Sequence, residues 1–172
     1  MLGKHVLMDF RTSKTRRLND IRYIYDFIED VSAAVDMTLV APPLIFRFPC
    51  TYTDYLRLAS TYPEFKELLE KRRNDFGVSG IGIWGLSHIA IHTWKELGIV
   101  SMDAYSCADF EEAKLYKVVE RYFPIREVIQ AIVLVRGTTI IHDVRASIGA
   151  GGGQCEEAHR GVHKCRNMCS VE

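Results

Sequence analysis

Three types of reactive side chain lie close together near the middle of the chain. Ser87, His88 and His92 fall on one short extended segment, and Cys107 follows after the next predicted strand. A serine hydroxyl is a weak nucleophile until a base or a strained backbone activates it, and an imidazole four or five residues away can be that base. We therefore predict a site in which serine, imidazole and thiol converge. On spacing alone, the same pattern occurs more often in an ordinary half-buried strand.

The segment that follows Ser87 has the two-residue period of a strand. One face is small and polar and carries His88, Ala90 and His92. The other face is mostly apolar and carries Ile89, Ile91 and Thr93. The preceding segment is predicted to be a strand as well, and it carries glycine at positions 77, 80, 82 and 85. Glycine there allows a backbone or a ligand to approach closely.

Several short motifs follow one another in a fixed order along the chain. They are Gly77–Gly80 (Gly-Val-Ser-Gly), Leu86–Trp94 (Leu-Ser-His-Ile-Ala-Ile-His-Thr-Trp), Glu96–Gly98 (Glu-Leu-Gly) and Asp103–Cys107 (Asp-Ala-Tyr-Ser-Cys). The series resembles the short prokaryotic form of S-adenosylmethionine decarboxylase. The opening segment Leu2–Phe10 and the segment Phe46–Pro49 also resemble that family, so the resemblance extends from about residue 2 to residue 137, with one insertion.

The resemblance implies a self-processing enzyme that needs no added cofactor. The Ser87 hydroxyl is expected to attack the carbonyl of Leu86, and the resulting ester to eliminate and hydrolyse to a pyruvoyl group generated from Ser87. The products are a β chain that ends at Leu86 and an α chain that begins with pyruvoyl. By the same resemblance, His92 is the processing base, and Ser79 assists that step by hydrogen bonding.

In the mature site, the resemblance implies that the pyruvoyl ketone forms a Schiff base with the substrate amine and accepts electrons as carbon dioxide leaves. Cys107 matches the family's proton donor, and a thiol with an ordinary pKa is largely protonated at neutral pH. Phe48 matches an aromatic residue that stacks on the adenine of the substrate. An ordinary core phenylalanine is an equally good interpretation of that position.

Three positions depart from the family pattern. Leu86 replaces the usual glutamate before the processed serine, Asp9 replaces a glutamate on the first strand, and Lys95 replaces a proline. Serinolysis uses the backbone carbonyl of residue 86, so cleavage remains possible, but the polar groups that select the substrate are altered. Two alternatives therefore stay open: a pyruvoyl-dependent ornithine or arginine decarboxylase, and an unprocessed paralogue that pairs with and regulates an active subunit.

A stretch from Cys50 to Phe76 is inserted relative to the family. Thr61 and Glu64 are spaced as a helix capping box, and Pro63 suits an early helical position. We predict a surface hairpin of helices with a solvated basic end. A lid over the substrate is the alternative.

Apolar periodicity predicts the order of the remaining elements. Strands are expected near Lys4–Phe10, Thr38–Phe48, Val78–Trp84, His88–Trp94, Val100–Ser106 and Ile129–Val135, and helices near Leu18–Val35 and Asp109–Phe123. Pro42 and Pro43 favour an edge position or a bulge. The predicted class is α+β, an antiparallel β-sheet with helices packed on one face and two β-α-β-type halves. By resemblance, the open face supports a homodimer of processed chains.

Composition predicts one compact domain. The chain has 172 residues, 48% of them hydrophobic, and its formal net charge is +0, so bulk charge favours neither nucleic acid nor an anionic membrane as a partner. We expect a small-molecule substrate, S-adenosylmethionine or a basic amino acid. With no apolar signal segment or membrane-length run, we expect a cytoplasmic protein.

The end of the chain differs from the rest. We predict a decarboxylase domain over residues 1–146, followed by a Gly-rich linker and a Cys/His-rich tail over residues 147–172. The potential ligands of the tail are Cys155, His159, His163, Cys165 and Cys169. Their spacing is not that of familiar zinc modules, so we predict no metal and a flexible tail with reduced thiols, with metal binding as the alternative. His5 and His142 are predicted to be structural or surface histidines.

Overall fold

A computed structural model describes residues 3–48, 60, 61, 63, 77–137, 141–145 and 148, although the side chain of Phe48 is not described. The predicted helical insertion lies outside the described residues except at Ser60, Thr61 and Pro63. The Cys/His-rich tail beyond residue 148 lies outside them as well.

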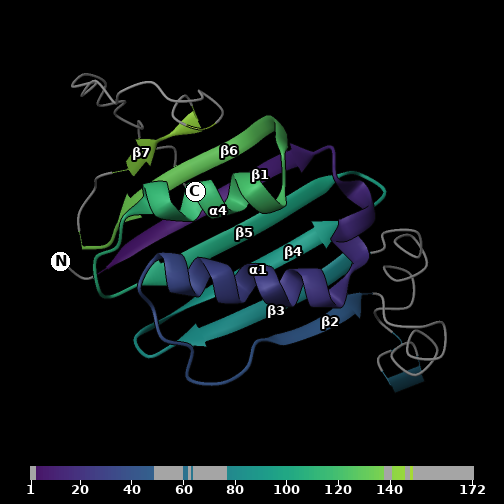
Figure 1. Ribbon diagram of the computed structural model, residues 1–172, viewed down its shortest axis with the longest axis horizontal. Coiled ribbons are helices and arrows are strands. Elements are labelled where there is room, and N and C mark those ends of the chain that lie inside the picture. Colours follow the sequence, from purple (N-terminus) through teal and green to yellow (C-terminus); the bar gives the residue numbers. More distant parts are fainter. Residues whose placement is uncertain are drawn as a thin grey trace, which may run out of the picture.

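Seven strands of the described residues form a single sheet in which every neighbouring pair is antiparallel (Figure 1). The strands are β1 (Lys4–Thr12), β2 (Leu44–Phe48), β3 (Gly77–Trp84), β4 (Ser87–Trp94), β5 (Ile99–Ser106), β6 (Ile125–Val135) and β7 (Ile141–Asp143). Their order across the sheet is β2-β3-β4-β5-β1-β6-β7. The amino-terminal strand therefore lies inside the sheet, next to β5.

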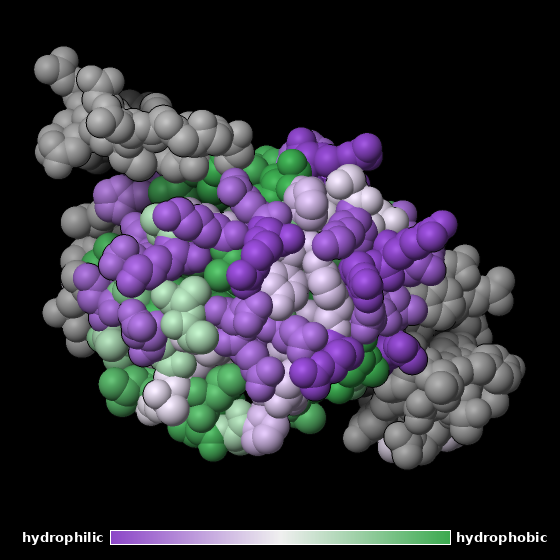
Figure 2. All heavy atoms as spheres, in the orientation of Figure 1, coloured by the Kyte–Doolittle hydropathy of each residue, from purple (hydrophilic) through white to green (hydrophobic). Residues whose placement is uncertain are grey.

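Two helices, α1 (Ile21–Ala34) and α4 (Glu112–Tyr122), lie side by side on one face of the sheet, and a short 3-10 helix, η1 (Thr15–Asn19), precedes α1 (Figure 1). The Asp20 side chain accepts a hydrogen bond from the backbone N–H of Tyr23 and so caps the start of α1. Hydrophilic side chains cover much of the outer surface of this helical layer (Figure 2). The predicted α+β class, with helices on one face, is confirmed.

The alternation predicted for β4 is present. Ile89 and Ile91 are completely buried beneath the helices, and Thr93 is 3% exposed, whereas His88 and His92 lie on the other face. We call that second face, which α1 and α4 do not cover, the open face.

The glycines of β3 allow a close approach, as predicted, and the approaching group is a helix. A Cβ atom at Gly82 would lie 2.6 Å from Cγ2 of Ile28 on α1, and one at Gly80 would lie 3.1 Å from Cδ1 of the same side chain. A larger residue at position 82 would push α1 away from the sheet.

Some boundaries differ from the sequence prediction. The strand predicted from Thr38 begins only at Leu44, after the prolines, and β2 is an edge strand as those prolines indicate. An isolated bridge joins Leu39 to Trp84. The last predicted strand begins earlier, at Ile125, and β7 was not predicted.

Among the described residues, neither helix has the length and apolar character needed to cross a bilayer.

Candidate active site

Two rows of side chains cross the open face. The His92 row consists of Ser79, His92, Ser101 and Asp9, which pair directly across β3, β4, β5 and β1. The Tyr105 row consists of His88, Tyr105 and His5 on β4, β5 and β1. The rows are four residues apart along each strand, which corresponds to about 13 Å.

Ser87 and Cys107 meet at one end of the sheet. Ser87 begins β4 and pairs with Ser106, the last residue of β5. The backbone N–H of Cys107 donates a hydrogen bond of 3.2 Å to Oγ of Ser87, and Cys107 is exposed. The structure therefore brings together the residues that carry the predicted hydroxyl and thiol.

The peptide bond before Ser87 lies in a tight turn. Gly85 and Leu86 form the two-residue connection between β3 and β4, and the Leu86 side chain is 67% exposed. Trp84 holds this turn, because its ring is buried and its indole N–H donates a hydrogen bond of 2.7 Å to Ser32 on α1. The turn is thus anchored at its base while its tip remains accessible.

Ser79 and His92 form a second pair, on the His92 row. Oγ of Ser79 lies 2.9 Å from Nδ1 of His92, at hydrogen-bond distance. Further along the row, the Ser101 hydroxyl donates a short hydrogen bond to the Asp9 carboxylate. The predicted substrate-binding residue Asp9 therefore lies on the same row as His92. Phe48 ends β2, at the edge of the sheet.

The prediction that serine, imidazole and thiol converge is only partly correct within one chain. Ser87 and His92 are five residues apart on an extended strand, which corresponds to about 16 Å, and an odd separation directs their side chains to opposite faces. The Ser79–His92 pair therefore does not reach Ser87 of its own chain. The structure forms two groups, one at Ser87 and Cys107 and the other on the His92 row.

A carboxylate joins the two histidines of the Tyr105 row. Nε2 of His5 and Nε2 of His88 each lie 3.1 Å from Oδ2 of Asp103. The hydrogen bond from His5 and a weaker contribution from His88 lower the pKa of Asp103 below its ordinary value of 3.8, although partial burial opposes the shift. Nitrogen and oxygen atoms of these three side chains all lie within 4.8 Å of one another.

Replacing Asp103 by asparagine is expected to destabilise the fold at pH 7 by about 1 kcal/mol, because the histidines lose a charged acceptor. The lowered pKa means that the carboxylate stabilises the folded state above pH 3.8 and that this contribution declines as the pH falls further. The difference between Asp103→Asn and the unaltered chain should therefore narrow between pH 7 and pH 3 in thermal unfolding. Asp26→Asn, on α1, is the control; Asp26 is half-buried and forms one solvent-accessible ion pair with Arg22, so its loss should change stability less at either pH. An Asp103→Asn effect independent of pH would contradict this account.

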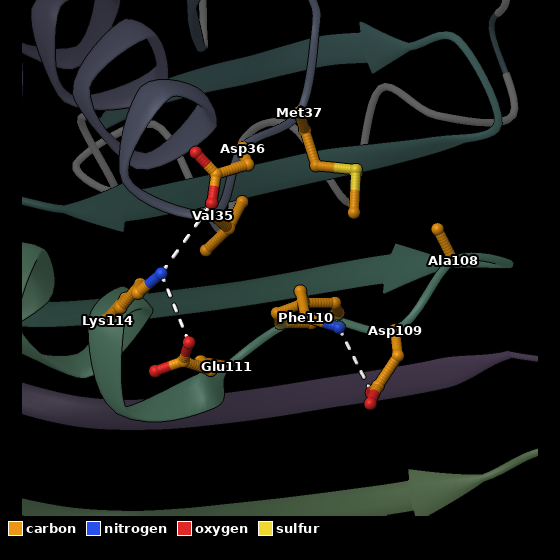
Figure 3. Close-up of a pocket in the computed structure, with 8 residues that line it drawn as sticks. All are labelled: Val35, Asp36, Met37, Ala108, Asp109, Phe110, Glu111 and Lys114. Carbon is orange, nitrogen blue, oxygen red and sulfur yellow. Dashed lines mark hydrogen bonds and ion pairs between the residues drawn. The ribbon is translucent and has the colours of Figure 1, made fainter.

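A cavity of about 380 Å³ lies on the helical side of the sheet, between the end of α1 and the segment before α4 (Figure 3). Its lining is Val35, Asp36, Met37, Ala108, Asp109, Phe110, Glu111 and Lys114. The Lys114 ammonium bridges Asp36 and Glu111, at 3.6 Å and 3.1 Å. None of the sequence-predicted site residues lines this cavity.

The family model for S-adenosylmethionine decarboxylase matches residues 4–137, which is most of the chain. The chain belongs to the S-adenosylmethionine decarboxylase family. The match includes both rows of the open face, the turn before Ser87, and Cys107.

Individual members of the family support the assignment. The chain is 30% identical over 108 residues to the S-adenosylmethionine decarboxylase proenzyme of Caldanaerobacter subterraneus subsp. tengcongensis, a match that covers 63% of this chain and 66% of that protein. It is 25% identical over 126 residues to the S-adenosylmethionine decarboxylase proenzyme of Archaeoglobus fulgidus, a match that covers 72% of this chain and 89% of that protein. The chain thus spans slightly less than two thirds of the first of these relatives.

The fold is also that of a solved family member. The crystal structure of the adenosylmethionine decarboxylase from Aquifex aeolicus superposes with a TM-score of 0.56 at 21% identity, covering 81% of this chain and 93% of that one. The likeness supports an antiparallel sheet with its helices on one face.

Sequence reasoning missed three residues of this region as members of a site. His5, Asp103 and Tyr105 lie on the open face because the two-residue period of β1 and β5 places them there. The period itself was visible in the sequence. The pairing of β1 with β5, which brings the three residues together, was not.

Proposed function

We propose that this chain is a self-processing pyruvoyl-dependent decarboxylase that converts S-adenosylmethionine to decarboxylated S-adenosylmethionine for spermidine synthesis. The observation that carries the proposal is the contact between Cys107 and Ser87 at an exposed turn, in a chain of the S-adenosylmethionine decarboxylase family. The relatives' name, proenzyme, is in keeping with activation by cleavage.

Cleavage begins at the turn before Ser87. The Ser87 oxygen bonds to the carbonyl carbon of Leu86, the amide C–N bond breaks, and the nitrogen of residue 87 takes up a proton. Elimination then removes the Cα proton of residue 87 and breaks its Cβ–Oγ bond, which forms a Cα=Cβ double bond and releases the carboxylate of Leu86. Water replaces the nitrogen of the remaining dehydroalanine, and ammonia leaves. The carbonyl of Leu86 supplies the electrophile, so a leucine side chain at this position permits the reaction.

Position 87 suits a small ketone because it lies at an anchored strand end beside an exposed thiol. A pyruvoyl group there supplies an electron sink for the loss of carbon dioxide from a bound amino acid. Cys107 then delivers its proton to the substrate α carbon. Asp9, on the His92 row, and Phe48, at the end of β2, are proposed to contact the substrate.

The base for cleavage is proposed to come from a second copy of the chain. His92 lies about 16 Å from Ser87 along its own strand, too far to take the hydroxyl proton. The open face also exposes large apolar side chains: Ile83 is 51% exposed, Leu44 63% and Phe46 46%. Burying them against the same face of a second copy makes a two-fold homodimer. Because Ser87 is the first residue of β4, next to the exposed Leu86, each Ser79–His92 pair is proposed to reach the Ser87 of its partner around that end of the strand.

Release of carbon dioxide from carboxyl-labelled S-adenosylmethionine, ornithine and arginine tests the proposal. We expect cleaved protein to release it from S-adenosylmethionine and not from the two amino acids. Leu86 and Asp9, which replace glutamates of the family pattern, favour ornithine or arginine as the substrate. Turnover of only these two amino acids would refute the proposal that S-adenosylmethionine is the substrate. An intact chain that is inactive alone but changes the rate of an active family member would support the regulatory paralogue.

A further inference from the structure

We propose that Tyr105 is a positioning residue for the Cys107 thiol, holding the sulfur in place through a hydrogen bond and stabilising the negative charge that forms on it when it gives up its proton. The expected effect of Tyr105 on turnover rests on the proposed decarboxylase function, whereas the hydrogen bond between Tyr105 and Cys107 does not.

The contact between the two side chains is direct. The phenol oxygen of Tyr105 lies 3.1 Å from Sγ of Cys107, a normal hydrogen-bond distance to sulfur. Tyr105 is the second-last residue of β5, and Cys107 lies just beyond the end of that strand, so the two side chains meet where the chain leaves the sheet. The same Cys107 binds Ser87 through its backbone N–H. Tyr105 is therefore linked through Cys107 to the proposed reaction centre.

Neighbouring groups fix the Tyr105 ring on several sides. Gly3, at φ +130°, lies so close that a Cβ atom there would be 2.6 Å from Cε2 of Tyr105 and 2.9 Å from its oxygen. The Arg136 guanidinium lies over the ring, 4.0 Å from its centre. The rings of His5 and His88 lie 5.7 Å and 5.9 Å from that of Tyr105. The phenol therefore has little freedom to turn away from the sulfur.

The chemistry of the pair makes Tyr105 the donor when Cys107 ionises. The hydrogen bond to Cys107 raises the pKa of Tyr105, as does burial, while Arg136 lowers it. With a net upward shift, the phenol keeps its proton at neutral pH. A protonated phenol stabilises a thiolate more than a thiol, because a hydrogen bond to an anion is charge-assisted.

Because the Tyr105 hydrogen bond stabilises the thiolate more than the thiol, it favours proton delivery by Cys107. When the S–H bond breaks, the proton moves to the substrate α carbon, where it bonds to the electron pair left by the departing carbon dioxide. The negative charge that remains on Sγ is stabilised by the Tyr105 hydroxyl, and water later returns a proton to the sulfur. The interaction is stronger in the charged state and so lowers the barrier.

Other charged groups surround this pair and stay unchanged when only the phenol oxygen is removed. Arg136 lies over the ring, His5 and His88 flank it with Asp103 between them, and Lys4 forms an ion pair of 2.7 Å with Asp109, two residues beyond Cys107. Tyr105→Phe therefore isolates the hydrogen bond from the local charge.

The test is the pH dependence of Cys107 alkylation by iodoacetamide, followed on the Cys107 peptide by mass spectrometry. We expect Tyr105→Phe to raise the pH midpoint by about one unit and to slow alkylation at neutral pH about tenfold. Tyr25→Phe, on α1, is the control and should leave the midpoint unchanged. An unchanged midpoint in Tyr105→Phe would overturn the inference.

The alkylation measurement needs no turnover, so it separates this inference from the proposed function. If the unaltered chain releases no carbon dioxide from any substrate, the proposed function fails, while the midpoint shift still decides the role of Tyr105. If it does release carbon dioxide, Tyr105→Phe should lower kcat with little change in KM. It should also convert more of residue 87 to alanine per turnover, because a proton misdelivered to the pyruvoyl-derived carbon leaves an amine there. Equal alanine formation in both proteins would count against the positioning role.

Discussion

Replacing Ser87 by alanine is expected to leave the 172-residue chain intact and to reduce decarboxylation below detection. The unaltered chain is expected to separate into residues 1–86 and 87–172, two chains of 86 residues each. Alanine has no oxygen to attack the Leu86 carbonyl and cannot become a ketone, so both the cut and the electron sink are lost together. Intact mass spectrometry is the measurement, since two halves of equal length can migrate as one band on a gel.

Ser13→Ala is the matched control for Ser87→Ala. Ser13 is an exposed serine in the loop after β1, and its loss should change neither the masses nor the rate. The processing hypothesis would be wrong if Ser87→Ala were still cut at this bond. It would also be wrong if the unaltered chain stayed whole and borohydride trapped no amine on it.

Much of the fold could be predicted where burial imposes a clear period. The alternation along β4 was visible because Ile89 and Ile91 pack beneath the helices while His88 and His92 do not. The start of β6 could not be predicted in this way. Its first six residues are only half-buried or exposed, and its pairing with β1 shifts register at two points, so no apolar period marks it. All three residues of β7 are exposed, which removes the same signal.

The site could be predicted in residue types but not in arrangement. The neighbours of Ser87 depend on which strands pair, and only the register of β4 with β5 places Cys107 beside it. The distance between Ser87 and His92 could have been predicted from the rise per residue of a strand, because two side chains five extended residues apart cannot be in contact. The motifs alone did not indicate that Ser87 and Cys107 lie at a strand end, apart from the His92 row.

The separation of Ser87 from His92 predicts that two inactive variants restore cleavage together. Ser87→Ala cannot be cut, and His92→Ala should be cut about 100-fold more slowly or worse, because a general base contributes at least that factor. In a mixed dimer, the His92→Ala copy retains its Ser87 and faces the intact Ser79–His92 pair of its partner. Co-expressed chains that pair at random should therefore yield rapid cleavage of about half of the His92→Ala copies, measured by intact mass.

The control for this mixture is co-expression of His92→Ala with the double variant Ser87→Ala/His92→Ala. That pairing offers a serine but no imidazole in either copy, so its cleavage should stay as slow as in His92→Ala alone. If the first mixture were equally slow, or if His92→Ala were cut at the unaltered rate, His92 would not act across a dimer interface. The base for Ser87 would then have to lie within its own chain. Rapid cleavage only in the first mixture requires the imidazole of one copy to act on the hydroxyl of the other, since no single chain in that mixture contains both.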